Sequence, residues 1–348
     1  MRSGLIRLSE AAPAAVKRYL LGRHMPPEII DWKYFDDRFN CGRERGLVLL
    51  RDDEVAGFLG LIPFRAEREG VEADCAWLCD WSIDPSQGGG MGLMLLKRAC
   101  GLYDGLFNVG GNENTRQIVP RLADRTVPDA AINLVLPLRL GSVFARLPGG
   151  FVKRVLSGQK FLQQIPLRWI RSSRDPQITI EPGLSARVAS LVENNAGGCW
   201  RPRYDSTFVD WQLGRCPAIT CWSCYSSSES ASRTGALIWK SRSSKGFWRL
   251  AFCGPTDDLE QVGVLVREIA SFVYEQRGIA LFAIASHLEG NLIRVLAQRG
   301  FLRRRNRLPF HVMRGRKPDL PTDEFAALSF LDTDMAYRFE LETTALDA

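Results

Sequence analysis

The chain of 348 residues lacks several features that would assign it to a class at once. It has no uninterrupted apolar stretch of 18 residues, so the sequence predicts no transmembrane helix. Residues 1–7 lack the apolar core of a signal peptide, and we expect a cytoplasmic protein. The net charge of +7 is moderate and no nucleic-acid-binding motif accompanies it, so we expect no nucleic acid as partner.

A zinc-type cysteine pattern is also missing. The nine cysteines are scattered and odd in number. Cys221 and Cys224 form one Cys-x-x-Cys pair without a second pair at zinc spacing, and Cys75 and Cys79 lie in or near a predicted strand. We interpret these residues as reduced thiols and expect no metal site.

A glycine-rich run is the most informative feature that the sequence does contain. It follows an apolar run over residues 76–83 and precedes a helical pattern over residues 93–99. Its members are Gln87, Gly88, Gly89, Gly90, Met91 and Gly92. Glycines let backbone N–H groups turn toward a ligand, and a helix start adds unpaired donors and the positive end of its dipole. A strand, a glycine loop and a helix in this order predict a site for a diphosphate.

Two familiar diphosphate loops do not fit this run. A Walker loop requires Lys and then Ser or Thr after its last glycine, where this chain has Leu93. A dinucleotide fingerprint requires a third glycine, and Leu93 again occupies that place. A plain glycine-rich connection remains an alternative.

The spacing that fits is Gln-x-x-Gly-x-Gly after a strand ending in Ile83-Asp84-Pro85. It resembles the acyl-CoA pyrophosphate loop of the general-control-type N-acetyltransferase (GNAT) superfamily. The resemblance implies acyl-CoA, in the first place acetyl-CoA, held by residues 87–92 with backbone contacts from Ile83. It also implies an α/β (α+β) fold in which mixed, mostly antiparallel sheets are flanked by helices.

The chain contains an internal repeat. Asp31-Trp32-Lys33 recurs as Asp210-Trp211-Gln212, an offset of 210 − 31 = 179 residues. Gly57 recurs as Gly235 in a similar apolar context, an offset of 235 − 57 = 178. A predicted strand and an amphipathic helix precede each copy, and this self-similarity predicts two similar units.

We therefore predict two tandem GNAT-like domains. Residues 1–139 form the domain with the acyl-CoA loop, and residues 176–315 form a degenerate second domain. Between them, residues 140–175 form a basic linker with helical pieces, which packs on a domain or makes a peripheral membrane contact. Residues 316–348 form a tail. The layout also resembles GNAT-like proteins of bacterial polysaccharide assembly and, more distantly, Fem-type aminoacyltransferases.

The second half lacks the glycine loop. Its central strand is followed by Gly254-Pro255-Thr256-Asp257-Asp258. Proline removes a donor N–H, and two aspartates repel a diphosphate. We expect Asp257 or Thr256 to cap the next helix, and we expect a single cofactor site, in the first half.

Catalytic candidates follow from the GNAT resemblance. Asp80 lies in the strand before the loop, where several family members carry an acidic group, although a solvated or arginine-paired carboxylate is the alternative. His287 follows the corresponding late strand of the second half and is a second candidate, an ordinary histidine being the alternative. Asn112 and Asn114 are candidates for binding the pantetheine arm, or they cap the following helix. The tyrosine that often protonates the leaving thiolate is replaced by Val119.

These observations predict an acyl-CoA-dependent N-acyltransferase in which an amine attacks the thioester directly. The acceptor we expect is a small molecule such as an amino sugar or its nucleotide form. One alternative is a non-catalytic acyl-CoA sensor or scaffold, which the missing tyrosine favours. Another is an aminoacyl- or acyl-carrier-protein-dependent transferase, which would suit the basic linker.

Overall fold

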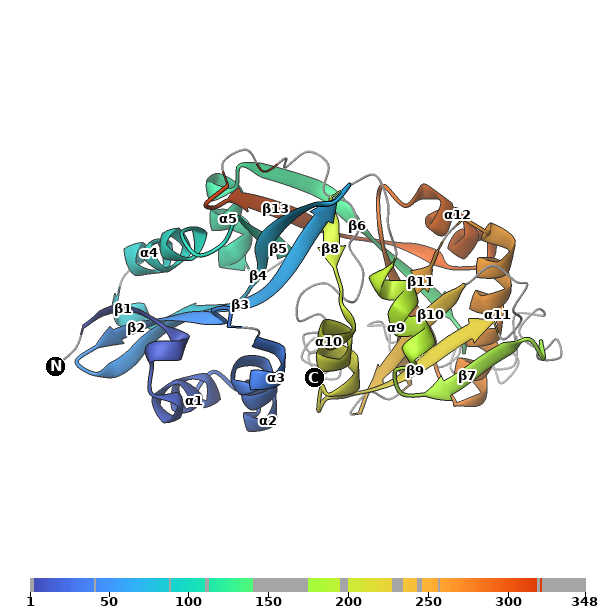
Figure 1. The fold of residues 1–348 in the computed structure, drawn as a ribbon, viewed down its shortest axis with the longest axis horizontal. Coiled ribbons are helices and arrows are strands. Elements are labelled where there is room, and N and C mark those ends of the chain that lie inside the picture. The colour runs from blue at the N-terminus through green and yellow to red at the C-terminus, as the bar shows by residue number, and fades with distance from the viewer. Residues whose placement is uncertain are drawn as a thin grey trace, which may run out of the picture.

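The computed structural model describes residues 3–40, 42–87, 89–109, 113–139, 175–194, 200–226, 234–242, 246–255, 257–317 and 320 (Figure 1). Within this part of the chain, no helix is long and apolar enough to cross a membrane. The predicted linker lies outside the described residues except for Asp175, and so does most of the predicted tail.

The first half contains six strands and their connecting helices. Its elements are β1 (Gly4–Arg7), α1 (Pro13–Leu21), α2 (Pro27–Ile30), the π-helix η2 (Asp31–Phe35), α3 (Asp37–Asn40), β2 (Gly46–Arg51), β3 (Glu54–Arg68), β4 (Val71–Ile83), the 3-10 turn η3 (Pro85–Gln87), α4 (Gly89–Cys100), β5 (Gly105–Val109), α5 (Glu113–Leu122) and β6 (Arg125–Pro137). Two-residue turns join β2 to β3 and β3 to β4. Asp52 and Asp53 are both left-handed, as are Glu69 and Gly70, which is the geometry of tight hairpin turns.

The second half repeats this order. Its elements are β7 (Ile178–Pro182), α9 (Ala186–Glu193), β8 (Arg201–Arg203), α10 (Ser206–Val209), the π-helix η4 (Asp210–Gly214), β9 (Ile219–Ser226), β10 (Gly235–Ser241), β11 (Phe247–Gly254), α11 (Leu259–Glu275), β12 (Ala280–Ser286), α12 (Gly290–Gln298) and β13 (Leu302–Arg314). Asp31 and Asp210 each begin a five-residue π-helix, so the repeat in sequence is also a repeat in structure.

The strands form one continuous sheet. Its order is β1-β2-β3-β4-β5-β13-β6-β12-β11-β10-β9-β7, with β8 paired to β3. Among the described strand pairs, β4 with β5 and β11 with β12 are parallel and the others are antiparallel. A mixed, mostly antiparallel sheet flanked by helices was the predicted fold class, and the structure confirms it.

The two halves exchange their last strands. β6 of the first half pairs with β12, and β13 of the second half pairs with β5. β6 and β13 also pair with each other, so they cross at the centre of the sheet (Figure 1). Each half therefore completes its sheet with a strand from the other half.

Helices cover both faces of the first half. On one face, Leu95, Leu96 and Ala99 of α4 belong to the same buried cluster as Ala76 and Leu106 of the sheet. On the other face, α1, α2 and η2 cover a second cluster that contains Phe58, Trp77 and Phe107. Because neighbouring strand residues point to opposite faces, Ala76 and Trp77 belong to different clusters.

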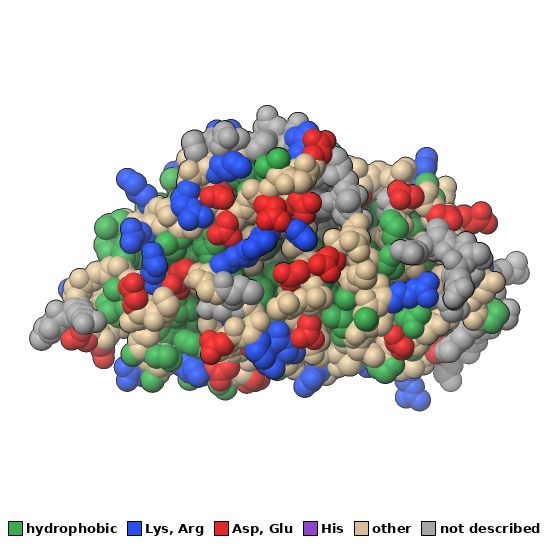
Figure 2. Space-filling view, in the orientation of Figure 1, with side chains coloured by type: hydrophobic (Ala, Val, Ile, Leu, Met, Phe, Trp, Pro, Cys, Tyr) green, Lys and Arg blue, Asp and Glu red, His purple; other side chains and the backbone are tan. Residues whose placement is uncertain are grey.

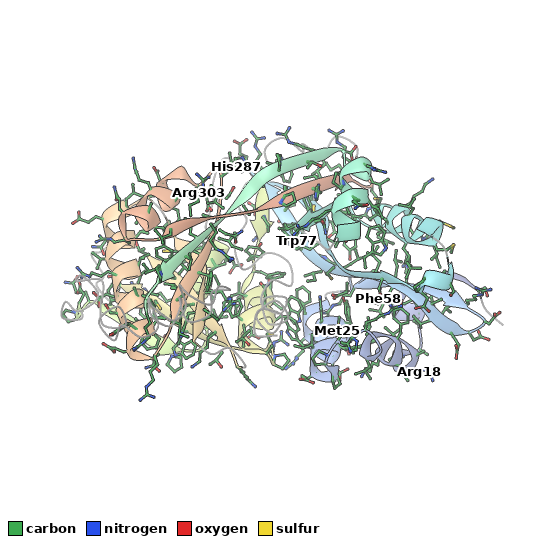
Figure 3. The ribbon with its side chains drawn as sticks, turned by 180° about the vertical axis from the view of Figure 1, so that it is seen from behind. Arg18, Met25, Phe58, Trp77, His287 and Arg303 are labelled. Carbon is green, nitrogen blue, oxygen red and sulfur yellow. The ribbon has the colours of Figure 1, made fainter. Side chains whose placement is uncertain are left out.

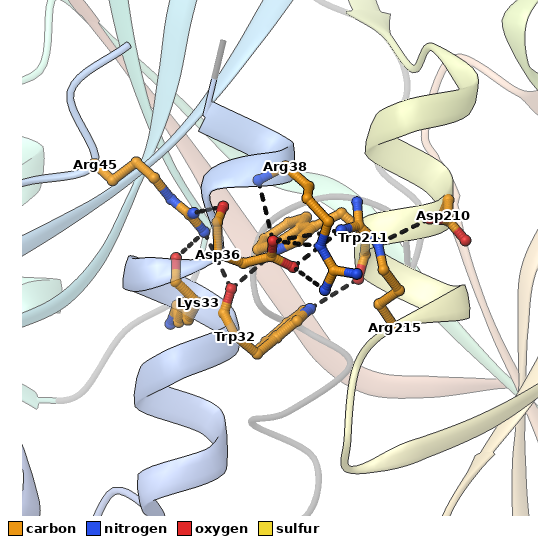
Figure 4. Close-up of polar contacts among 8 residues, drawn as sticks. All are labelled: Trp32, Lys33, Asp36, Arg38, Arg45, Asp210, Trp211 and Arg215. Atoms are coloured by element: carbon orange, nitrogen blue, oxygen red, sulfur yellow. Dashed lines mark hydrogen bonds and ion pairs between the residues drawn. The ribbon is translucent and has the colours of Figure 1, made fainter. Parts of the chain in front are cut away.

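The two π-helices meet where the halves contact (Figure 4). The rings of Trp32 and Trp211 stack with centroids 4.6 Å apart. Each indole N–H donates to the backbone oxygen of the other tryptophan, at 2.8 Å from Trp32 and 3.0 Å from Trp211. Asp36 binds Arg215 at 3.1 Å, and 36 + 179 = 215, so repeat-related positions pair with each other. The contact therefore has pseudo-twofold symmetry about the two tryptophans.

A row of ion pairs adds a second link between the halves. Arg203 of β8 binds Glu72 of β4 at 2.7 Å and Glu67 of β3 at 3.5 Å. Arg65 also binds Glu72, and Arg43 binds Asp74. Figure 2 shows basic and acidic side chains interleaved near the middle of this face of the molecule.

Candidate functional site

The glycine run follows β4 and continues into the first turn of α4. The structure differs from the prediction in where the helix begins, because α4 starts at Gly89 and not near Leu93. Gly89, Gly90 and Gly92 therefore belong to the first turn of the helix, where the backbone N–H groups have no partner within the helix. Gly88 and the side chain of Gln87 lie outside the described part.

The space around the glycines differs from one to the next. A Cβ added at Gly90 would meet no atom within 4 Å, so this side of the helix start is open. A Cβ added at Gly92 would lie 3.2 Å from the ring of Trp81. Gly92 thus serves the packing of Trp81 onto α4, whereas Gly90 leaves its backbone accessible. Met91 is half-buried against the cluster beneath α4.

β4 and β5 separate beside the helix start. They pair only from Cys75 with Gly105 to Trp77 with Phe107. From Leu78 to Ile83, β3 is the one described strand that pairs with β4. A fork between two parallel strands therefore leaves one edge of the β4 backbone without a described strand partner, next to α4.

A β-bulge accompanies the fork. Cys79 pairs with Gly60 and Ser82 with Phe58, so Asp80 and Trp81 together face the single residue Leu59. Asp80 has a φ of 46°, a left-handed conformation that costs a non-glycine residue about 1 kcal/mol. Ile83 ends the strand opposite Gly57, and the N–H of Asp84 binds the oxygen of Ala56 at 2.9 Å.

Asp80 lies within a buried polar cluster. Lys33 and the Tyr34 hydroxyl both donate to its Oδ2, and the Tyr34 hydroxyl also lies 3.5 Å from Cys79 Sγ. Lys33 is fully buried, whereas the Asp80 side chain keeps 14% of its surface exposed. Burial raises the pKa of Tyr34 well above its usual value, and Asp80 raises it further, so this hydroxyl keeps its proton. Sequence reasoning proposed Asp80 but missed Lys33 and Tyr34.

His287 lies elsewhere. It follows β12, is exposed, and directs both its backbone N–H (2.9 Å) and its ring Nδ1 (3.2 Å) to the oxygen of Ala130. In Figure 3 it stands beside β6, apart from Phe58, the strand neighbour of the Asp80 bulge. The structure does not bring His287 to Asp80, and its catalytic role stays a prediction.

The side chains of the two asparagine candidates are not among the described groups. Asn112 and the side chain of Asn114 lie outside the described residues, and the Asn114 backbone belongs to the first turn of α5. Val119 of α5 is fully buried, so the position expected to carry a tyrosine is a core position here. Further along, Asp124 accepts a hydrogen bond from the Arg314 N–H at 2.7 Å.

The second half has a fork without the loop. β11 and β12 pair from Phe247 with Ala280 to Leu250 with Ala283 and no further. Where α4 has glycines, α11 is capped by Asp258, whose side chain accepts from the Gln261 N–H at 3.0 Å. This corrects the predicted cap at Asp257 or Thr256 by one or two residues. A carboxylate occupies the helix start, where a bound phosphate would need free N–H groups.

Comparison with known proteins places the fold. The chain superposes on a conserved protein of unknown function from Enterococcus faecalis V583, described as a probable N-acyltransferase, with a TM-score of 0.56, 11% identity and coverage of 89% of this chain and 72% of that one. A GCN5-related N-acetyltransferase from Anabaena variabilis superposes with a TM-score of 0.52 at 14% identity, over 89% of this chain and 72% of that one. Saccharomyces cerevisiae N-myristoyltransferase with bound myristoyl-CoA superposes with a TM-score of 0.55 at 9% identity, over 89% of this chain and 80% of that one. No family model and no curated protein matches the sequence.

At these identities the likeness concerns the fold alone. Across 89% of its length, the chain shares its architecture with structures described as acyltransferases. Within the described residues, no group of three potential metal ligands gathers.

Proposed function

We propose that the protein is an acyl-CoA-dependent N-acyltransferase. The observation that carries the proposal is the fork between β4 and β5 directly beside a glycine-rich helix start, present in one half of the molecule. The fold shared with structures described as N-acyltransferases supports it. An acyl-CoA donor and the seven described thiols, none in a disulfide, agree with a cytoplasmic protein.

Each part of the site has a proposed role. The first turn of α4, with Gln87 and Gly88 ahead of it, holds the pyrophosphate through backbone N–H groups. The edge of β4 from Leu78 to Ile83 binds the pantetheine arm and polarises the thioester carbonyl. Asn112 and Asn114 complete the pantetheine contacts in this proposal.

The reaction forms an N–C bond and breaks the C–S bond of the thioester. The acceptor amine attacks the polarised carbonyl, its proton passes to Asp80 directly or through a water, and CoA leaves as thiolate that takes a proton from solvent. Since Val119 is buried, α5 offers no tyrosine for that last step.

The acceptor is proposed to enter from the face covered by η2. A cavity of about 280 Å³ lies on this side between the halves. Its lining includes Phe39 and Phe64 from the first half, Phe208 from the second, and both arginines and acidic residues. Phe64 is four residues from Gly60, or about 13 Å along β3. An amine carried on an extended group, such as a nucleotide amino sugar, fits that span.

Calorimetry with CoA, acetyl-CoA and myristoyl-CoA tests the donor. We expect micromolar binding of acetyl-CoA, abolished by Gly90→Glu, because the new carboxylate enters the open space at the helix start and repels the pyrophosphate. Gly290→Glu is the matched control, since Gly290 begins α12 and also faces open space. Equal affinity of the wild type and Gly90→Glu would remove the main support for the proposal.

A non-catalytic acyl-CoA sensor is the second candidate. The buried Val119 favours it, because transferases of the resembled family often carry at this position a tyrosine that protonates the leaving thiolate. Release of CoA thiol with glucosamine or a UDP-linked amino sugar separates the two. Binding without thiol release supports the sensor.

A further inference from the structure

The polar cluster at the bulge of β4 is built from three separate segments. Lys33 and Tyr34 come from η2, Cys79 and Asp80 from β4, and Gly60 from β3. A Cβ added at Gly60 would lie 2.1 Å from the Tyr34 hydroxyl oxygen and 2.9 Å from Cys79 Sγ. The position is therefore restricted to glycine by the hydroxyl that lies over it.

The bulge is what brings two consecutive side chains to one hydroxyl. In a regular strand, Cys79 and Asp80 would point to opposite faces. Here the left-handed Asp80 turns toward η2, and Tyr34 contacts both side chains. Trp81 then returns to the α4 face, where its ring packs over Gly92. Asp80 and Trp81 are adjacent in β4, so the contacts of Asp80 with η2 are linked directly to the packing of Trp81 on α4.

The second half provides an internal comparison. Lys33 corresponds to Gln212 (33 + 179), Tyr34 to Leu213 (34 + 179) and Gly60 to Ile238 (60 + 178). Gln212, Leu213 and Ile238 are all buried. The half without the glycine loop therefore keeps the π-helix but carries none of the three cluster residues. A cluster needed only to pack a π-helix on a sheet would have no reason to differ in this way.

We propose that Lys33 and Tyr34 are positioning residues for acyl transfer, acting through Asp80. This rests on the proposed function. Both donors end on Oδ2, which fixes the carboxylate and leaves Oδ1 to take the proton of the attacking amine. The same two bonds hold the left-handed backbone of Asp80 in place. They thereby keep the β4 edge separated from β5 at the fork.

The experiment compares Lys33→Met with Gln212→Met. The two positions are repeat-related and both fully buried, so the pair separates the cluster from general damage to the core. We expect Lys33→Met, Tyr34→Phe and Asp80→Asn to lower kcat, with Asp80→Asn at about 100-fold or more. The Kd for CoA should stay within about two-fold, and Gln212→Met should keep wild-type kcat. Lys33→Arg should recover part of the loss.

A double variant guards against unfolding. Lys33→Met alone leaves a buried carboxylate without its cation, which is destabilising, whereas Lys33→Met with Asp80→Asn removes both charges. If Lys33 acts through Asp80, the double variant is no slower than Asp80→Asn alone. A purely structural role predicts additive losses. Thiol release from acetyl-CoA and thermal unfolding are measured on the same samples.

The outcomes separate this inference from the proposed function. If the wild type binds no acyl-CoA or releases no thiol, the transferase proposal fails and the positioning role fails with it. If the wild type turns over but Lys33→Met has the same kcat as Gln212→Met, only the positioning role is overturned. The same holds if the kcat losses of Lys33→Met and Asp80→Asn add in the double variant. A loss of kcat confined to the cluster, with unchanged Kd and non-additive losses, supports it.

Discussion

Several side chains in the first half are confined by neighbours far away in the sequence. Lys33 is fully buried, and an ammonium group tolerates such a place only beside a carboxylate, here Asp80. Arg45 is buried as well, and desolvation lowers its pKa to about 10. Its guanidinium donates to the backbone oxygens of Asp36 at 2.9 Å and of Trp32 at 3.3 Å. Charged groups in the core thus bind the irregular backbone of η2.

His311 of β13 is a buried titratable group away from the fork cluster. Its Nδ1 lies 2.9 Å from the Thr126 hydroxyl, and its Nε2 has no hydrogen-bond partner among the residues that the structure describes. Burial lowers the pKa of His311, so below about pH 6.5 the unfolded chain binds a proton that the folded chain does not. Stability therefore rises with pH up to about pH 6.5 and falls as the pH drops below it.

Urea unfolding between pH 5 and 7.5 measures this effect. We expect the wild type to lose up to about 1.4 kcal/mol per pH unit more than His311→Asn below pH 6.5. His24→Asn, at an exposed position, serves as control and should follow the wild type. Identical slopes for the wild type and His311→Asn would contradict the assignment.

The π-helices η2 and η4 are the elements that unite the halves. Each places a tryptophan so that its N–H reaches the other's backbone oxygen, while the rings stack. A π-helix carries about one extra residue per turn, and such turns are frequent at functional sites. Here that extra residue accompanies both the inter-half contact and the placement of Lys33 and Tyr34.

Replacing either tryptophan should weaken the same contact. We expect Trp32→Phe and Trp211→Phe each to lower the free energy of unfolding by about 1–3 kcal/mol, because each removes an indole N–H that donates to a buried carbonyl. The double variant should lose clearly less than the sum, since the two rings share one stack.

Trp248→Phe is the matched control, because Trp248 belongs to a separate buried cluster in the second half. Its loss should add to that of Trp32→Phe within about 0.5 kcal/mol. Urea titration measures the wild type, the three single variants and the two double variants that contain Trp32→Phe. Additive losses at Trp32 and Trp211 would argue against a coupled pair.

At the scale of the molecule, strand exchange makes the halves interdependent. Without β13, the edge of β5 would be unpaired, and without β6, β12 would lose the partner on its other side. An open apolar edge of this kind favours aggregation. The ion pairs of Arg203 and the tryptophan contact add to the same dependence.

Separated halves test this dependence. We expect residues 1–139 alone and residues 175–348 alone to aggregate or unfold without cooperativity, and co-expression to restore a folded complex. Circular dichroism and size-exclusion chromatography report the result. Cooperative unfolding of the isolated first half would show that β13 is dispensable to it.

Local signals in the sequence were enough to predict part of this structure. The glycine run predicted the helix start beside β4, the repeat predicted the duplicated order of elements, and Pro255 with the following aspartates predicted a second half without a loop. Strand exchange leaves no local signal, because β6 and β13 have the same apolar pattern whichever neighbour they pair with. The Lys33–Asp80 contact also leaves no local signal, because the two residues are 47 positions apart in the sequence. The difference between Lys33 and Gln212 within the repeat was visible in the sequence.

The strand exchange has a consequence for biosynthesis. After β6 ends at Pro137, the ribosome must add 302 − 137 = 165 residues to reach Leu302, the first residue of β13. At about 5–20 residues per second, this takes on the order of 8–33 s. Throughout that interval, the nascent first half holds the β5 edge that β13 will cover. The β5 edge therefore needs protection until β13 has been synthesised.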